Sequence, residues 1–298
     1  MKLPSPLTTA DIRMEDGAIV RLRRHGNPAG PRLALSHGNG LAINGYFPFW
    51  DLLRNRYDLI LFDFRNHGEN PLGDFEHHNW PQFIRDLQRV WVEIGTHFGS
   101  KRIAGVFHSL SAVSAVTHTQ QMGPRWDPLV LFDPPFFPPD GHPLRNVQRT
   151  NEDDIASRAD RRTPRYPEPA GLAAQLARRF KLWQPAAYEL MARATLRPDP
   201  VAGDWVLACP REYEAHIFRS NRNAGAWTGL AHMPVGVKLI CADPAVGDTP
   251  SRIGQTIATE MPVEYEAIFG TTHFLQIERP DECVRAMDAF LAKYEMVG

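Results

Sequence analysis

Ile103-Ala-Gly-Val-Phe-His-Ser109-Leu-Ser-Ala112 joins an apolar segment to a run typical of a helix. The residues before His108 predict a buried strand, and the apolar continuation at residues 113–116 predicts a helix. A serine on the sharp turn between a strand and a helix is held clear of the sheet, beside the free N–H groups of the helix N-terminus. We therefore predict that Ser109 is a nucleophile. Ser111 and an inert serine-rich turn are the alternatives.

Such a turn is cramped, and small residues are expected two positions before and two positions after the nucleophile. Ser111 fits this pattern, but Phe107 does not. The bulk of Phe107 keeps an alternative open, in which the scaffold binds a ligand without catalysing a reaction.

Similar apolar segments recur along the chain and end at Gly, Asp or His. They span Arg32–Ser36, Tyr57–Phe64, Leu129–Phe132, Val237–Cys241 and Val263–Phe269. Continuous rather than alternating hydrophobicity is typical of strands that are covered on both faces. Apolar residues at helical spacing predict helices over Trp80–Phe98 and from about Asp281 to Met296. Strands that alternate with helices predict an α/β fold with a mostly parallel central sheet flanked by helices.

The pattern changes between Pro134 and Pro210, a stretch that holds 12 of the 26 prolines. No strand is expected there, and helices are expected near residues 171–182, 185–196 and 211–220. We predict one α/β core, residues 1–135 and 232–298, interrupted by a helical cap insertion, residues 136–231.

Composition narrows the class of protein. Lys plus Arg number 33 against 34 for Asp plus Glu, so the net charge is −1. Binding to nucleic acid or to an anionic membrane needs a basic surface, so neither partner is expected. The three cysteines, Cys209, Cys241 and Cys283, are scattered and predict neither a disulfide framework nor a zinc site. With no apolar run of about 20 residues, we expect a cytoplasmic protein outside the membrane.

Two further motifs carry chemistry. Leu35-Ser-His-Gly-Asn-Gly40 closes an early strand, and its glycines let the backbone curl toward the sheet edge. Acyl transfer needs two N–H donors for the oxyanion, and we predict the N–H groups of Asn39 and Leu110 for this role, with His37 as a buried structural ring. His273 follows the last strand and is the predicted general base. His67, His77 and His78 lack an acidic partner at ligand spacing, so no metal is expected.

The order of glycine-rich loop, serine and histidine resembles the α/β-hydrolase superfamily over the whole chain. Asp63-Phe-Arg-Asn-His-Gly68 is similar to a turn common in that fold. We expect Asp63 and Arg65 to form a structural hydrogen-bonding pair there. The resemblance implies that the insertion is a cap over the active site.

A carboxylate must orient His273 in a triad. Three aspartates stand at plausible strand ends. The superfamily's usual placement favours Asp243, with Asp248 as an alternative nearby. Some members use the position one strand earlier, which here is Asp133 in Leu131-Phe-Asp-Pro-Pro135.

These features predict a serine hydrolase of esterase type that cleaves a small to medium carbonyl substrate through an acyl-enzyme, without a cofactor. A carbon–carbon bond hydrolase, a lyase or an acyltransferase on the same fold is the alternative among enzymes. The substrate is expected to be a small molecule, and the sequence leaves a homodimer open.

Overall fold

The computed structural model describes residues 3–246 and 249–298, which form a sheet of eight strands in the order β1-β2-β4-β3-β5-β6-β10-β11. The strands from β4 to β11 in this order pair in parallel, whereas the pairs β1–β2 and β2–β4 at one edge are antiparallel. The strands are β1 Thr8–Arg13, β2 Ile19–Gly26, β3 Arg32–Ser36, β4 Asp58–Phe62, β5 Ile103–His108, β6 Leu129–Phe132, β10 Val237–Ala242 and β11 Glu264–Ile268. The predicted mostly parallel α/β sheet is confirmed.

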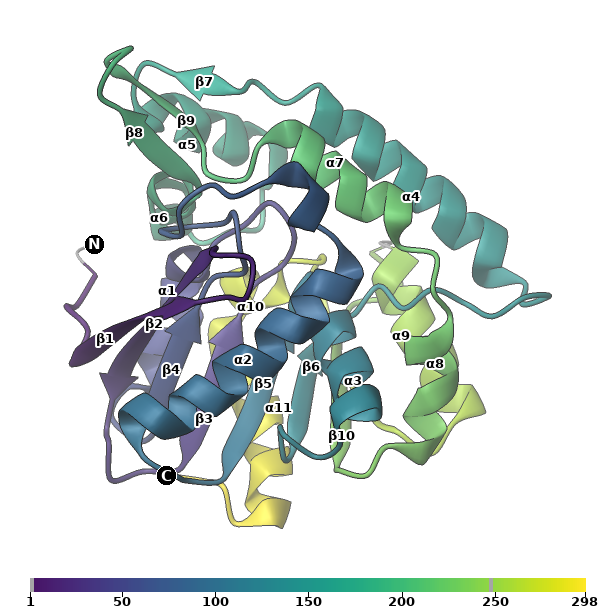
Figure 1. The fold of residues 1–298 in the computed structure, drawn as a ribbon. Helices are drawn as coiled ribbons and strands as arrows, with labels where there is room; N and C mark the ends of the chain where they lie inside the picture. The colour runs from purple at the N-terminus through teal and green to yellow at the C-terminus, as the bar shows by residue number, and fades with distance from the viewer. Residues whose placement is uncertain (1–2, 247–248) are drawn as a thin grey trace.

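Helices cover both faces of this sheet (Figure 1). One face packs on α2, α3, α8 and α9, and the other on α1, α10 and α11. The α-helices are α1 Phe47–Trp50, α2 Trp80–Phe98, α3 Leu110–Met122, α4 Leu144–Asp160, α5 Pro169–Arg179, α6 Pro185–Thr195, α7 Arg211–Ser220, α8 Gly225–Gly229, α9 Thr249–Glu260, α10 Leu275–Glu278 and α11 Pro280–Leu291. Short 3-10 turns are η1 Ile43–Tyr46, η2 Asp51–Leu53, η3 Phe75–His77, η4 Leu230–His232 and η5 Ala292–Tyr294. In the described part of the chain, no helix combines the length and apolarity needed to cross a bilayer.

The segment between β6 and β10 lies over one end of the sheet, where α4 to α7 form a separate layer (Figure 1). The prediction that strands are absent there is wrong. A small sheet in the order β7-β9-β8 joins these helices, with β7 Arg165–Tyr166, β8 Leu196–Asp199 and β9 Asp204–Leu207. Its strands are too short, and too often interrupted by proline or charge, to show an alternating pattern. We call α4 to α7 with this small sheet the cap.

The end of the cap comes earlier than residue 231. α8 packs against α3, and Trp227 and Leu230 belong to the hydrophobic core of the sheet. Hydrophobic contact with the sheet therefore assigns the segment after α7 to the core.

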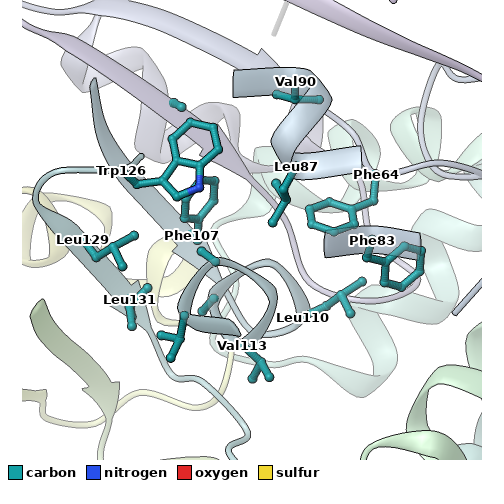
Figure 2. Packing of buried hydrophobic residues seen from close by; sticks show 14 of the residues in the cluster. Phe64, Phe83, Leu87, Val90, Phe107, Leu110, Val113, Trp126, Leu129 and Leu131 are labelled. Carbon is teal, nitrogen blue, oxygen red and sulfur yellow. The ribbon is translucent and has the colours of Figure 1, made fainter. Parts of the chain in front are cut away.

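Phe107 fits the turn because a glycine makes room for it. Its ring is fully buried and lies edge-on to Trp126 and Phe62, with centroid distances of 5.4 and 6.3 Å. Figure 2 shows Phe107 beside Trp126 within this cluster. Gly105 lies two residues earlier on the same face of β5, and a Cβ there would stand 2.5 Å from Phe107 Cε2. The turn needs free volume on this face of the strand. Gly105, which has no side chain, provides that volume, so the ring of Phe107 can be accommodated.

Gly105→Ala is expected to destabilise the protein by about 1–3 kcal/mol, because the new methyl group overpacks a filled core. In a Phe107→Ala background the same change should cost less, since the nearest clash is gone and only the flexible end of Leu129, with Cδ2 at 2.8 Å, remains in the way. Urea unfolding of the two single variants and the double variant measures this coupling.

Gly95→Ala is the matched control. Gly95 lies inside α2, and a Cβ there would meet nothing within 4 Å. Alanine should therefore stabilise the helix by up to ~1 kcal/mol. Equal destabilisation by Gly105→Ala with and without Phe107 would contradict the account of this turn.

Candidate functional site

Ser109 occupies a strained turn at the carboxyl end of β5. Its φ of 54° and ψ of −113° are unusual for a residue with a side chain. The Ser109 N–H donates to Phe132 O at 3.0 Å. Ser111 Oγ accepts from His108 N and donates to His108 O, both at 2.9 Å. Ser111 is therefore buried and stabilises the turn through its hydroxyl group, whereas Ser109 remains 6% exposed.

Ser109, His273 and Asp133 form a continuous row of hydrogen bonds. Ser109 Oγ lies 3.0 Å from His273 Nε2, and His273 Nδ1 lies 2.6 Å from Asp133 Oδ2. A carboxylate can only accept, so Nδ1 carries the proton and Nε2 accepts from the serine hydroxyl. In this arrangement the histidine is poised to take a proton from Ser109.

Asp243, the aspartate favoured from the sequence, does not contact His273, so that prediction is wrong. Asp243 accepts from Gly270 N and Ala245 N at 2.9 and 2.8 Å, so its carboxylate binds the loops around it. These bonds lower the pKa of Asp243. Asp133 follows β6, which pairs directly with the strand that carries Ser109, and it is the alternative that reaches His273. Asp248 lies outside the described residues.

The residues whose N–H groups are the predicted donors lie next to Ser109 or next to Gly38, which adjoins it. Gly38 lies so close that an added Cβ would stand 3.1 Å from Ser109 Cβ. Leu110 begins α3 directly after the serine. Within the described ranges, no protein acceptor is recorded for the N–H of Asn39 or of Leu110. The Asn39 side chain donates to Glu214 O in α7 at 2.9 Å, which fixes the loop against the cap.

Two buried histidines brace this loop. His37 Nδ1–H donates to Gly38 O at 2.8 Å, and its Nε2 accepts from Phe64 N at 3.1 Å. His67 donates to Arg65 O and accepts from Gly40 N. Burial lowers the pKa of both rings, so both are neutral. Within residues 3–246 and 249–298, no three His, Cys, Asp or Glu side chains gather as a metal site would require.

Asp63 and Arg65 are structural, but they do not pair with each other. Asp63 accepts from the buried Arg23 at 2.6 Å and from Ile43 N at 2.7 Å. Arg65 binds Asp86 and Asp16 instead.

A chain of hydrogen bonds, which the sequence analysis did not predict, joins the glycine-rich loop at residues 37–40 to His273. We call this chain the relay. His108 Nε2–H donates to His273 O at 2.8 Å, which leaves Nδ1 to accept from Tyr46 Oη at 2.6 Å. Tyr46 Oη in turn accepts from Gly38 N at 3.2 Å. Burial lowers the pKa of His108 and raises that of Tyr46, so both stay neutral. The only sequence signals were the adjacency of His108 to Ser109 and of Tyr46 to the glycine-rich loop.

A cavity of about 300 Å³ lies between this row and the cap. Ser109, His273 and Asn39 line its floor. The cap contributes one stripe from α4 (Asn151, Ile155 and Arg158) and one from α5 (Leu172, Gln175, Leu176 and Arg179). Among the aromatic residues of the cap, Tyr166, Phe180 and Phe218 line the cavity, whereas Trp183, Tyr188 and Trp205 do not.

Comparison with known proteins identifies the family and the fold. The sequence model of the alpha/beta hydrolase family matches residues 33–286. No curated protein matches the sequence. Among solved structures, E-2-(acetamidomethylene)succinate hydrolase superposes with a TM-score of 0.77 at 17% identity, covering 96% of this chain and 100% of that chain.

Two further structures have the same fold. The thioesterase domain from the curacin biosynthetic pathway has a TM-score of 0.73 at 15% identity and covers 94% of this chain and 98% of its own. A thermophilic esterase from Thermogutta terrifontis has a TM-score of 0.66 at 17% identity and covers 96% and 98%. At these identities the similarity shows the fold alone.

The buried neutral histidines predict that stability falls in mild acid. Burial lowers the pKa of six histidine rings. The pKa of His25 and His118 falls to about 4 and that of His78 to about 3, and the pKa values of His37, His67 and His108 are also lowered. Below the unfolded pKa near 6.5, the unfolded chain binds protons that the native state excludes. The free energy of unfolding should therefore drop by ~1.4 kcal/mol per ring and pH unit.

Urea unfolding between pH 8 and pH 5 measures this slope. His118→Gln should lower the slope by one ring's share, because the variant has no group to titrate at that position. A free energy of unfolding that stays level down to pH 5 would show that these rings are protonated in the native state.

Proposed function

Because the chain belongs to the alpha/beta hydrolase family, we propose that it is a serine hydrolase in which Ser109, His273 and Asp133 form the catalytic triad. The observation that carries the proposal is the row of hydrogen bonds at 3.0 and 2.6 Å that faces the cavity under the cap. This order of nucleophile, base and orienting carboxylate is the arrangement that acyl transfer requires.

In the first half-reaction, His273 Nε2 takes the Ser109 proton as Oγ attacks the carbonyl carbon of an ester. The charge that develops on the carbonyl oxygen is received by the N–H groups of Asn39 and Leu110. The protonated ring is stabilised by Asp133 and gives its proton to the leaving alcohol. The products are the alcohol and an acyl-enzyme.

In the second half-reaction, His273 takes a proton from water, and the resulting hydroxide attacks the acyl carbon. Collapse of the intermediate returns the proton to Ser109 Oγ and releases the acid. The cavity of about 300 Å³ fits a small or medium ester. A covered cavity of this size favours such a substrate over a polymer.

The relay through Tyr46 and His108 has a positioning role in this mechanism. It fixes the main chain of His273 from one side, while Asp133 fixes the ring from the other. Through Gly38, the relay also holds the loop that presents the Asn39 N–H. Loss of the relay should therefore impair transition-state geometry more than substrate binding.

A fluorophosphonate probe tests the nucleophile. Wild-type protein should be labelled at Ser109, Ser109→Ala should not be labelled, and the matched control Ser111→Ala should keep labelling if its fold survives. Thermal unfolding of each variant checks the fold. An unlabelled Ser109 in folded protein would overturn the proposal.

Two aspartate variants test the acid. Asp133→Asn should lower kcat on 4-nitrophenyl esters by ~10⁴-fold, because His273 loses the partner that holds its tautomer and stabilises its charge. Asp243→Asn should stay near the wild-type rate, since its carboxylate binds only loop N–H groups. The opposite ranking would assign the acid to Asp243.

Tyr46→Phe tests the relay. It should lower kcat by roughly 10- to 100-fold with little change in KM. His108→Gln, which can still donate to His273 O, should retain more activity than His108→Leu. The control is Tyr57→Phe, which removes another tyrosine hydroxyl, bound to Asp288 outside the cavity. If both tyrosine variants lower kcat equally, the relay has no specific role.

A further inference from the structure

The charges on the cavity wall are unbalanced. Arg158, Arg162 and Arg179 line the cavity, and the acidic residues recorded on the same wall are Glu152 and Glu214. Arg162 is bound to Glu214, so that pair has no net charge. Among the described residues, no hydrogen bond or ion pair is recorded for the side chain of Arg158.

Several arginines around Arg158 are paired with carboxylates. Arg219 pairs with Asp160, Arg222 with Asp153, and Arg165 with Asp199 and Asp204. Arg158 belongs to the α4 stripe that faces Ser109 and His273 across the cavity, at helical spacing from Asn151 and Ile155. An unpaired guanidinium at that place is a ready donor for a carboxylate.

Glu152 does not oppose this charge at neutral pH. The side chain is 1% exposed, and its Oε1 accepts from Gln148 Nε2 and Asn221 Nδ2, both at 2.7 Å. Its Oε2 has no partner. Both donors to Glu152 are neutral amides, and burial raises the pKa of the carboxyl to about 8. Glu152 is therefore mostly uncharged at pH 7.

We propose that the cavity selects substrates that carry a carboxylate in addition to the carbonyl group that is attacked, and that Arg158 binds this carboxylate. The inference rests on the proposed serine hydrolase function and adds the substrate class to it. Arg158 is exposed although it lines the cavity, so a carboxylate bound there keeps part of its contact with water and the attraction is modest.

Ester pairs of equal length test the substrate class. Mono-4-nitrophenyl adipate and suberate carry a terminal carboxylate, and 4-nitrophenyl hexanoate and octanoate are their neutral counterparts. A third pair, 4-carboxyphenyl butyrate and its methyl ester, places the charge on the leaving group. The quantity compared is the ratio of kcat/KM for the anionic ester to that for its neutral counterpart.

Wild-type enzyme should prefer the anionic member of at least one pair by roughly 5- to 10-fold. Arg158→Gln should bring this ratio close to one, mainly by raising KM for the anionic ester, and Arg158→Lys should keep part of the preference. The matched control is Arg161→Gln, which changes a neighbouring exposed arginine that does not line the cavity. Raising the salt concentration should weaken the preference.

The pH dependence gives an independent readout. The charged groups recorded around Glu152 are Arg222 and Asp153, which pair with each other, and His273 from the loop after β11. Glu214 of α7 also lines the cavity, where it is paired with Arg162. The lining residue from α9 is Pro250, which carries no charge. As pH rises from 7 to 9, Glu152 gains a negative charge, so the anion preference should fall. Glu152→Gln should keep the preference constant over this range.

The outcomes separate the two proposals. Turnover of neutral esters without any preference for anionic ones, or an equal loss of preference in Arg158→Gln and Arg161→Gln, would overturn the carboxylate subsite and leave the hydrolase function standing. Failure of every ester together with an unlabelled Ser109 would overturn the hydrolase function itself.

Discussion

The backbone of Ser109 is the constraint on which the rest of the site depends. A positive φ at a residue with a side chain costs free energy, and surrounding contacts must hold it in place. Here the N–H of Ser109 is bonded to β6, and the hydroxyl of Ser111 closes the turn on both polar groups of His108. The turn puts the serine hydroxyl on one side and starts α3 on the other. Without it, neither His273 nor the N–H of Leu110 would meet the same reacting atom.

The same turn explains why the sequence pattern was informative despite its irregularity. A small residue is expected two positions before the serine because the ring of a larger one has no space. In this chain the space is provided by Gly105, and Phe107 fills it against Trp126. The requirement for a small residue is a limit on the total side-chain volume along one face of the strand. A sequence motif defined one position at a time does not show that a glycine at position 105 can compensate for a large residue at position 107.

Most of the central sheet and the long helix α2 could be predicted because their apolar periodicity is strong. β1 and β2 were missed, since β1 has few apolar residues and arginines interrupt the pattern of β2. The small sheet of the cap has strands of two to four residues. The choice between Asp133 and Asp243 could not be made from spacing, because both follow strands that end at the same edge of the sheet. It depends on which carboxylate is taken up by neighbouring N–H groups, and that is a property of loop conformation.

The bond between the Asn39 side chain and Glu214 O ties two functions of the fold together. One end belongs to the glycine-rich loop beside Ser109, and the other belongs to a helix of the cap. Gly40 strengthens this link, because only the absence of a side chain lets Glu214 lie against the loop. Any displacement of α7 away from the sheet must break that bond. Opening of the cavity would therefore also change the conformation of the glycine-rich loop at residues 37–40.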